Sequence, residues 1–135
     1  MSTEANKAVV RRLIEAFNEQ DLDALDQLMA PDLAQSFKQQ VIPWVYATFA
    51  GHQIAITDLV AEGDQVVARL ATSGGHSGEW RGIPPTGKQW TNTGVYFLRL
   101  SEGKIVELSS LFDEMNHALQ LGATITPPVL AGEQA

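Results

Sequence analysis

The stretch that decides the fold spans residues 78–113 and reads GEWRGIPPTGKQWTNTGVYFLRLSEGKIVELSSLFD. Residues 84–87, Pro-Pro-Thr-Gly, are typical of a tight β-turn, because proline presets φ at the second turn position and glycine suits the fourth. Residues 88–100 are rich in the aromatic and β-branched residues that strands favour. A Ser-Glu-Gly-Lys connection at 101–104 then leads into a return strand over 105–112. The stretch therefore predicts two long antiparallel strands.

The N-terminal third of the chain has helical periodicity. Residues 4–19 carry apolar side chains on one stripe and charged ones off it, which predicts an amphipathic helix with a serine or threonine cap. Asp21 is a good cap for a shorter second helix, which we expect to end at Pro31. Residues 34–49 also have near-helical spacing, and we expect a kink or a restart at Pro43 because proline removes a helix hydrogen bond.

Two more strands are expected before the opening stretch. Residues 51–53 read as a turn, and residues 54–61 and 65–72 then form a hairpin around Glu-Gly-Asp. Gly74 and Gly75 follow within the strand region. Adjacent glycines there indicate either a β-bulge or a backbone that another group approaches closely.

The order of these elements predicts the fold class. The helices come mainly before the strands, and one short helix over 114–121 follows them, which is typical of an α+β domain. A sheet this long must curl or be covered to bury its inner face. We therefore expect a cone-shaped, curved antiparallel sheet wrapped around the N-terminal helices. We expect residues 1–123 to form a single domain and residues 124–135 a C-terminal tail.

Composition excludes several classes of function. The chain has 135 residues, 44% of them hydrophobic, which suits one globular domain. Its formal net charge of -7 argues against nucleic-acid and anionic-membrane partners, which need a basic surface. It has no cysteine, so disulfides and thiol chemistry are excluded. No apolar run approaches the ~20 residues of a membrane span, and the N-terminus lacks the apolar core of a signal peptide, so we expect a cytoplasmic location.

The candidate site residues point to acid/base chemistry or to plain binding in an apolar cavity. The histidines His52, His76 and His117 lie far apart in the sequence and match no metal-binding spacing, so we expect no metal site. His76 follows the glycine pair and either points into a cavity or is satisfied in the core. Arg69, in mid-strand, either lies on a solvated face or points inward to an anionic partner. Trp44 either packs in the core or forms a pocket wall.

Four segments resemble the SnoaL-like polyketide cyclase and ester cyclase branch of the NTF2-like superfamily, from about Lys7 to Ala123. They are AFNEQDLDALDQLMAPDL, DLVAEGDQVVARLATSGGHSGEWRGIPPTGK, FLRLSEGKIVELSSLFD and QLGA. The most specific part is GIPPTGK at residues 82–88, since no fold rule demands that string. The resemblance implies a cone-shaped α+β barrel with a central cavity that is often dimeric.

The resemblance also implies an activity and a site. Cyclases of this family close a ring by an intramolecular aldol reaction, without metal or organic cofactor, and use an acidic residue as acid/base. Asp113 stands at the matching position, although an aspartate there is also a good helix cap. His76 or Arg69 would polarise the carbonyl group. The walls around a small hydrophobic molecule would come from Trp44, Trp90, Tyr96, Phe97 and Leu111.

One departure from the family leaves the function open. Relatives carry a Glu-His-Trp run on the last strand, whereas residues 107–109 here are Glu-Leu-Ser. Its loss favours a non-catalytic small-molecule binding protein, while the retained Asp113 favours a cyclase, or an isomerase or hydrolase that uses the same pocket. We also expect a homodimer through the outer face of the sheet, because Trp80, Trp90 and Phe97 are too many large apolar groups for both faces to be solvated.

Overall fold

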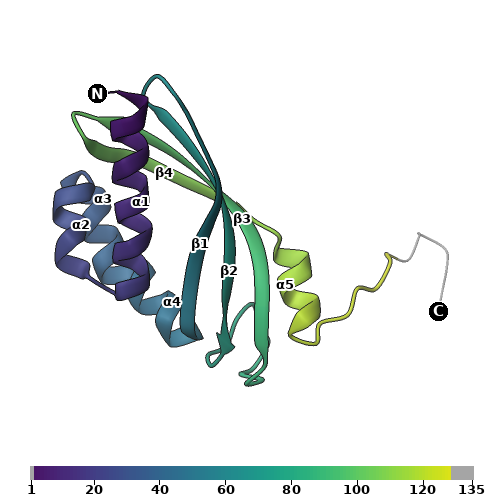
Figure 1. Ribbon diagram of the computed structural model, residues 1–135. Helices are drawn as coiled ribbons and strands as arrows, with labels where there is room; N and C mark the ends of the chain where they lie inside the picture. Colours follow the sequence, from purple (N-terminus) through teal and green to yellow (C-terminus); the bar gives the residue numbers. More distant parts are fainter. Residues whose placement is uncertain (1, 129–135) are drawn as a thin grey trace.

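A computed structural model describes residues 2–128. The helical layer comprises α1 (Thr3–Glu19), α2 (Leu22–Leu28), α3 (Pro31–Ser36), the π-helical turn η1 (Phe37–Val41) and α4 (Ile42–Thr48). The strands are β1 (Phe49–Glu62), β2 (Gln65–His76), β3 (Gln89–Ser101) and β4 (Lys104–Phe112), and helix α5 (Glu114–Gln120) follows. Helices α1 to α4 lie on one side of a strongly twisted sheet, whereas α5 lies beyond the end of β4 (Figure 1).

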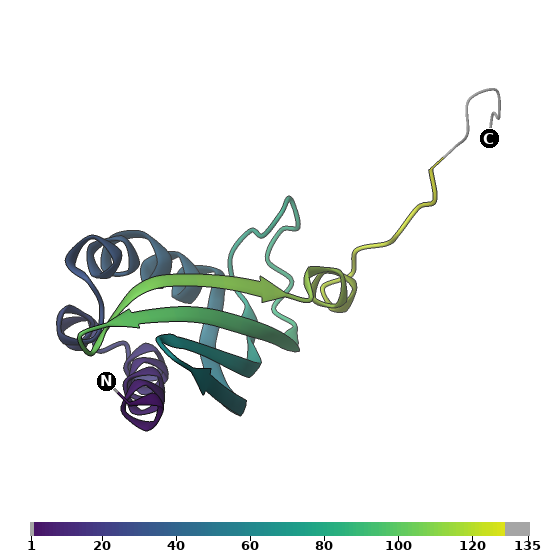
Figure 2. The same ribbon diagram turned by 90° about the horizontal axis from the view of Figure 1, so that it is seen from above.

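The sheet is a simple meander. Its strands are hydrogen-bonded in the order β1-β2-β3-β4, and each is antiparallel to its neighbour. Seen from above, the strands curve beside the helical layer (Figure 2). The predicted α+β class, with a curved antiparallel sheet wrapped around the N-terminal helices, is confirmed.

The helices begin and end where short-range rules place them, with one exception. Ser2 caps α1 by accepting a hydrogen bond from the amide of Ala5, and Asp21 caps α2. The prediction that α2 runs to Pro31 is wrong: α2 ends at Leu28, and Pro31 begins α3 instead. Proline is favoured at that first position, where its missing N–H has no helical partner to lose.

The helix restart predicted at Pro43 is confirmed. Pro43 is the second residue of α4, and the π-helical turn η1 comes immediately before it. Wider helical turns of this kind accommodate a residue that cannot donate to the helix ladder.

Strand β1 contains an irregularity that sequence reasoning placed elsewhere. The turn predicted at residues 51–53 is wrong, because β1 continues through it and shifts register between Ala50 and Gln53, with Gly51 at φ +67°. The β-bulge predicted at Gly74 and Gly75 lies instead in β1. Ala50 pairs with Gly75 and Gln53 with Ser73, so the extra residue is in β1 opposite Gly74, while β2 pairs with β3 without a shift. The alternative, a close approach, is confirmed at Gly74: a Cβ atom there would lie 3.2 Å from Cζ2 of Trp90.

The tight turn in the loop between β2 and β3 also lies earlier than predicted. Trp80 and Ile83 exchange backbone hydrogen bonds of 3.0 and 2.8 Å around Arg81 and Gly82, which both have positive φ. The β-turn predicted at residues 84–87 is wrong, and that segment runs on without a turn of its own. Two positive-φ residues between paired positions make the two-residue hairpin turn that matches strand twist.

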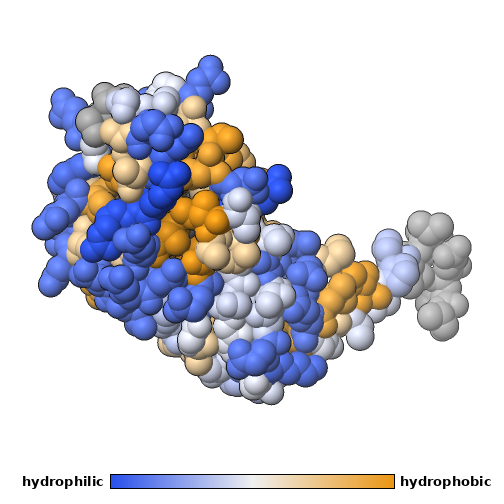
Figure 3. Space-filling view, in the orientation of Figure 1, coloured by the Kyte–Doolittle hydropathy of each residue, from blue (hydrophilic) through white to orange (hydrophobic). Residues whose placement is uncertain are grey.

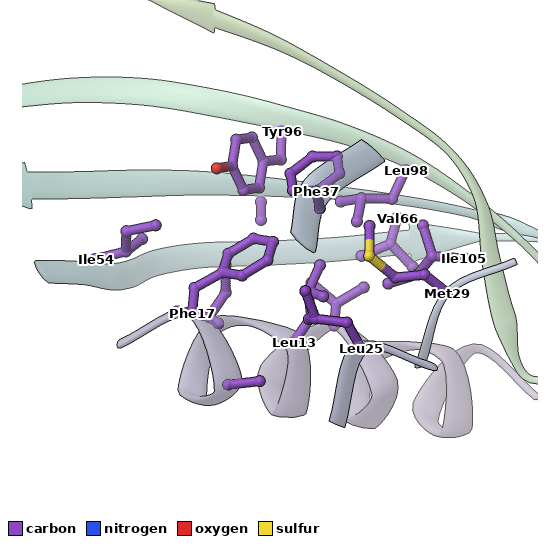
Figure 4. Packing of buried hydrophobic residues seen from close by; sticks show 14 of the residues in the cluster. Leu13, Phe17, Leu25, Met29, Phe37, Ile54, Val66, Tyr96, Leu98 and Ile105 are labelled. Atoms are coloured by element: carbon purple, nitrogen blue, oxygen red, sulfur yellow. The ribbon is translucent and has the colours of Figure 1, made fainter. Parts of the chain in front are cut away.

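The core divides into two clusters. An aliphatic cluster fills the space between α1 and the sheet, where Leu13, Val66 and Ile105 are fully buried and the rings of Phe17 and Phe37 stack at 5.5 Å (Figure 4). An aromatic cluster at the other end of the strands is built around Phe49, Trp80, Trp90 and Leu121. On the surface, hydrophilic side chains cover most of the helical layer and an apolar strip lies beside α1 (Figure 3).

Candidate functional site

A cavity of about 380 Å³ lies next to the aromatic cluster. Pockets that hold small organic molecules are typically about 300–1,000 Å³ and mostly apolar. Aromatic rings predominate in this one. Its lining comprises Phe37, Val41, Trp44, Val45, Phe49, His52, Thr72, Trp80, Trp90, Asn92, Tyr96, Leu108, Ser110, Phe112, Glu114 and His117.

Three of the predicted wall residues lie in this cavity. Trp90 and Tyr96 are buried on the inner face of β3, two and four residues from the cavity-lining Asn92. Trp44 lies on α4 and is half exposed, with its ring edge-on to Phe49 at 6.0 Å. The structure therefore places Trp44 in the pocket wall, rather than in the closed core that its helical spacing favoured.

Three other predicted residues lie on the outer face of the sheet. Successive side chains of a strand alternate between faces, so the burial of Tyr96 on the inner face turns Phe97 outward, where it is 42% exposed. Leu111 is 68% exposed. The side chain of Arg69 is also solvated and lies 3.4 Å from Asp58. The expectation that these three residues contact a molecule in the cavity is wrong, because their strand positions face away from it.

Asp113 lies outside the lining of the cavity. Its side chain caps α5 by accepting a 3.0 Å hydrogen bond from the amide of Asn116. It borders a shallow groove on the outer face together with Arg69 and Leu111. The expectation that Asp113 faces the cavity is therefore wrong, because the orphan amides at the helix start hold its carboxylate. Its role as acid/base stays a prediction from the resemblance.

His76 is buried and does not line the cavity. Its side chain is 1% exposed, and its Nδ1 lies 2.9 Å from Oγ1 of Thr86 and 3.2 Å from the Thr86 amide nitrogen. His76 is thus a core residue, with Nδ1 bonded to Thr86 and Nε2 buried without a hydrogen-bond partner among residues 2–128. The β-bulge that was expected to aim it into a cavity is absent from this part of β2.

Sequence reasoning missed two histidines that do line the cavity. His52 follows Gly51 in the irregular part of β1, and the register shift there brings both Phe49 and His52 to the inner face. Burial, and then the charge of His117, lower the pKa of His52 to about 4. Gly51 in a strand-rich region is the sequence signal from which a re-aimed side chain at this position could have been predicted.

His117 lies at the centre of the aromatic cluster. It is 6% exposed on α5, and its ring centroid is 4.1 Å from that of Trp90 and 4.5 Å from that of Trp80. Burial lowers its pKa to about 4, with a further lowering from His76 and an opposing effect from Glu114. Both cavity histidines are therefore neutral imidazoles at neutral pH. The Nε2 atom of His117 has no hydrogen-bond partner among residues 2–128.

Helix α5 is held against the part of β3 that extends beyond β4. Pairing between these strands ends at Phe112. Past that point the side-chain amide of Gln120 bonds the backbone nitrogen and oxygen of Thr91 at 3.0 and 2.6 Å, and Asn116 bonds Asn92 at 3.1 Å. These side-chain hydrogen bonds satisfy β3 where β4 does not pair with it, and they hold α5 so that His117 lines the cavity. No local sequence pattern indicates them.

Polar groups are few in the cavity. Thr72, Asn92 and Ser110 lie on its sheet wall, and Glu114 at its edge forms an ion pair with Arg81. Burial raises the pKa of Tyr96, so its phenol stays protonated and acts as a hydrogen-bond donor. Within residues 2–128, no group of three or more histidines and carboxylates is arranged to hold a metal ion. Over the same range, no helix is long and apolar enough to cross a membrane.

Comparison with known proteins decides the family. The model of the family described as SnoaL-like polyketide cyclase matches residues 7–121. The chain belongs to the SnoaL-like polyketide cyclase family. Nogalonic acid methyl ester cyclase of Streptomyces nogalater is 27% identical over 123 residues, which are 82% of this chain and 92% of that protein. Aklanonic acid methyl ester cyclase of Streptomyces galilaeus is 27% identical over 73% of this chain and 77% of that protein.

Solved structures show the same fold. TsrD from Streptomyces laurentii superposes on this SnoaL-like chain with a TM-score of 0.83 at 23% identity, over 92% of this chain and 99% of TsrD. The SnoaL-like resemblance stated from the sequence is thus confirmed. A SnoaL-like protein is expected to bind a small molecule, and the aromatic cavity is large enough to hold one.

Proposed function

We propose that this SnoaL-like protein is a cofactor-independent cyclase that acts on a hydrophobic carbonyl compound held in the aromatic cavity. The observation that carries the proposal is the pair of neutral imidazoles, His52 and His117, on the wall of a mostly apolar pocket. A base of pKa about 4 suits this task. Ketosteroid isomerase removes a proton next to a carbonyl with a carboxylate of similar pKa.

The proposed reaction is an intramolecular aldol closure. The imidazole of His117 takes a proton from the carbon next to one carbonyl group, and the electron pair of that C–H bond moves into an enolate. The enolate carbon attacks a second carbonyl carbon of the same molecule, which forms the ring bond and an alkoxide. The imidazolium then returns the proton to the alkoxide. The product is an isomer of the substrate, so the balance needs no redox partner.

The polar groups of the sheet wall suit the oxygen atoms of such a substrate. The protonated phenol of Tyr96 is available as a hydrogen-bond donor, and the amide of Asn92 is held in place by Asn116. Hydrogen bonds that strengthen as charge develops on an oxygen lower the barrier most. The aromatic rings around these groups would hold the carbon skeleton and exclude water.

The assay compares two variants on the methyl esters named in the relatives, nogalonic acid and aklanonic acid methyl ester. We expect His117→Gln to lower kcat by about 100-fold or more, the usual contribution of a general base. Asp113→Asn keeps an efficient helix cap, so its kcat should stay within about threefold of wild type. The reverse result would make Asp113, freed from its cap, the proton carrier that the resemblance implies.

A second candidate is a binding protein without chemistry. The observation that favours it is Leu108 in the cavity lining, within the run where relatives carry Glu-His-Trp. Mass spectrometry of the molecule that co-purifies with wild type and with His117→Gln separates the two. A cyclase would accumulate unreacted substrate only in the variant, whereas a binding protein would hold the same molecule in both.

We also propose that residues 1–123 form a single domain. Two copies of this domain form a homodimer through the outer faces of their sheets. Of the three aromatic residues on which the dimer prediction was based, Trp80 and Trp90 are buried inside the protein and cannot contribute to the interface. Phe97 and Leu111 remain as exposed apolar side chains on the outer face. Sedimentation at micromolar concentration should show a dimer that Phe97→Asp dissociates.

The cytoplasmic location stays a prediction, and the tail predicted at 124–135 lies partly outside the described residues.

A further inference from the structure

We propose that Thr86 and His76 form a clamp that positions Trp80 as a cavity wall. This gives the GIPPTGK motif a role that the proposed chemistry leaves unexplained. Thr86 is the one residue of the motif whose side chain reaches a buried polar group, the imidazole of His76. The clamp determines the shape of the cavity whether or not the protein is an enzyme. Only the statement that Trp80 contacts a substrate rests on the proposed function.

The hydrogen bonds of the clamp define the tautomer of His76. The Thr86 amide lies 3.2 Å from Nδ1 of His76, and an amide N–H can only donate. Nδ1 must therefore carry a lone pair, which leaves the proton of the neutral ring on Nε2, an atom that is buried and has no hydrogen-bond partner among residues 2–128. The hydroxyl of Thr86, 2.9 Å from the same Nδ1, then shares this one lone pair with the amide as a second donor, and its oxygen accepts a 3.2 Å bond from the Lys88 amide. The backbones join as well, since the His76 amide bonds the Lys88 oxygen and the Gly87 amide bonds the His76 oxygen, both at 2.9 Å.

The rest of the motif brings Thr86 to this position. Pro84 and Pro85 stiffen the segment and have no amide hydrogen that would need a partner. Gly87 follows at φ +70°, a conformation that other residues rarely adopt. These features return the chain from the Arg81-Gly82 turn to His76 over a few residues. The order of residue types in the motif thus follows from what the clamp requires.

The clamp reaches the site through Trp80. The loop is fixed at its other base, where the amides of Ser77 and Gly78 both bond the Thr48 oxygen, at 2.9 and 3.0 Å. With both bases fixed, the hairpin presents the buried ring of Trp80 to the cavity, with its centroid 4.5 Å from that of His117. His76 itself does not line the cavity, so it is a positioning residue that acts through Trp80.

The first test reads the clamp directly in the wild-type protein. Ring-nitrogen NMR shifts distinguish the two neutral imidazole tautomers, and we expect His76 with its proton on Nε2 at pH 7. A proton on Nδ1 would overturn the proposal, because Nδ1 could then not accept the hydrogen bond from the Thr86 amide. This measurement needs no variant, ligand or activity.

The second test removes one hydroxyl and keeps the shape of the side chain. The protein is labelled with fluorotryptophan, and Trp80→Phe assigns the Trp80 fluorine signal. Thr86→Val removes the hydroxyl that bonds Nδ1 of His76 and the Lys88 amide. It should shift or broaden that signal and weaken the binding of the neutral probe N-phenyl-1-naphthylamine by about threefold to tenfold. Thr86→Ser should restore both. Thr57→Val is the matched control, since its hydroxyl bonds the Arg69 backbone oxygen on the outer face.

The outcomes separate the clamp from the proposed function. An unchanged Trp80 signal and unchanged probe affinity in Thr86→Val would overturn the clamp, even if the protein proves to be an active cyclase. A changed signal that Thr86→Ser restores would support the clamp, even if no methyl ester is converted. In an active enzyme, Thr86→Val should raise KM more than it lowers kcat, because a displaced wall weakens binding while His117 keeps its chemistry.

Discussion

The two ends of the inner sheet face are made by the same strands and serve different purposes. At the aliphatic end, helix α1 packs side chains such as Leu13 against Val66 and Ile105, and all three are fully buried. At the aromatic end, rings such as Trp90 meet at angles, leave a cavity and bury nitrogens that have no partner among residues 2–128. Dense aliphatic packing stabilises the fold, whereas unfilled space and unpaired donors suit a ligand.

The difference between the ends follows the sequence of each strand. The inner positions of β2 change along the strand from Val66, Ala68 and Leu70 to Thr72 and Gly74. Glycines at the aromatic end leave room for rings on the neighbouring strands, and a Cβ atom at Gly94 would lie 2.2 Å from the Phe112 ring. The sheet wall of the cavity is therefore encoded by small residues placed beside large ones.

The largest expected effect comes from breaking the aliphatic end. Leu13→Ala removes a fully buried side chain and should cost about 2–5 kcal/mol of unfolding free energy. Urea denaturation measures the loss. Leu111→Ala removes the same atoms from a side chain that is 68% exposed, and should stay within about 0.5 kcal/mol of wild type. Similar losses in both variants would mean that the helical layer does not fill this end of the sheet.

Acid should destabilise the aromatic end. His117 has its pKa lowered from 6.5 to about 4 in the folded protein, so the unfolded chain takes up its proton first as pH falls. The stabilisation is fully present above pH 6.5 and is lost as pH falls towards 4. It amounts to about 3 kcal/mol, of which about 2 kcal/mol is lost by pH 5. His52 should add a loss of the same sign.

Urea denaturation between pH 7.5 and 5 checks the acid effect. His117→Gln serves as the control, because it removes one of the two titrating imidazoles and should reduce the pH dependence to the part that His52 contributes, whatever its own stability. A wild-type stability that is constant over this range would contradict the account of the aromatic end as a place where imidazoles are held neutral.

A smaller effect is expected from filling the space beside Phe112. Gly94→Ala places a methyl group where the Phe112 ring lies, so the ring must move and the variant should lose about 1–3 kcal/mol. The same change should alter the affinity for N-phenyl-1-naphthylamine, since Phe112 lines the cavity. Gly63→Ala is a useful contrast: no atom lies within 4 Å of its added Cβ, so any loss there reflects its positive φ alone and should leave probe affinity unchanged.

The smallest effect is expected at Asp113, the helix cap between β4 and α5. Asp113→Ala should cost about 1 kcal/mol, because it leaves helix amides without their cap, while Asp113→Asn should cost less. Thermal unfolding measures both. Equal losses in the two variants would indicate that the carboxylate charge, and not its capping bond, is what the fold uses at this position.

Much of the fold could be predicted because its signals are local. Caps at Ser2 and Asp21, the stripe of α1 and the β3–β4 hairpin each depend on a few neighbouring residues. The errors at residues 51–53 and 84–87 came from turn-forming residues that the structure uses for a register shift and for the clamp on His76. Glycine and proline mark irregular backbone reliably, but the type of irregularity depends on what packs there.

The site was predicted less completely because it depends on strand parity and on long-range contact. Nothing in the sequence near residues 96 and 97 says which of Tyr96 and Phe97 faces inward, since both are large aromatic residues on adjacent positions. His117 enters the cavity only because side chains of α5 bond the free part of β3, a contact between segments that are distant in sequence. Asp113 fitted both a cap and an acid, and the observed hydrogen bond is that of a cap.

The central claim is that the aromatic end holds neutral imidazoles ready for a ligand, and an NMR titration of the histidine ring protons tests it most directly. We expect the His52 and His117 signals to keep their neutral positions as pH falls through 6.5 and to titrate only near pH 4. Saturation with N-phenyl-1-naphthylamine should shift both signals at pH 7, because both rings line the cavity. Ordinary titration near pH 6.5, with no response to the probe, would contradict the account.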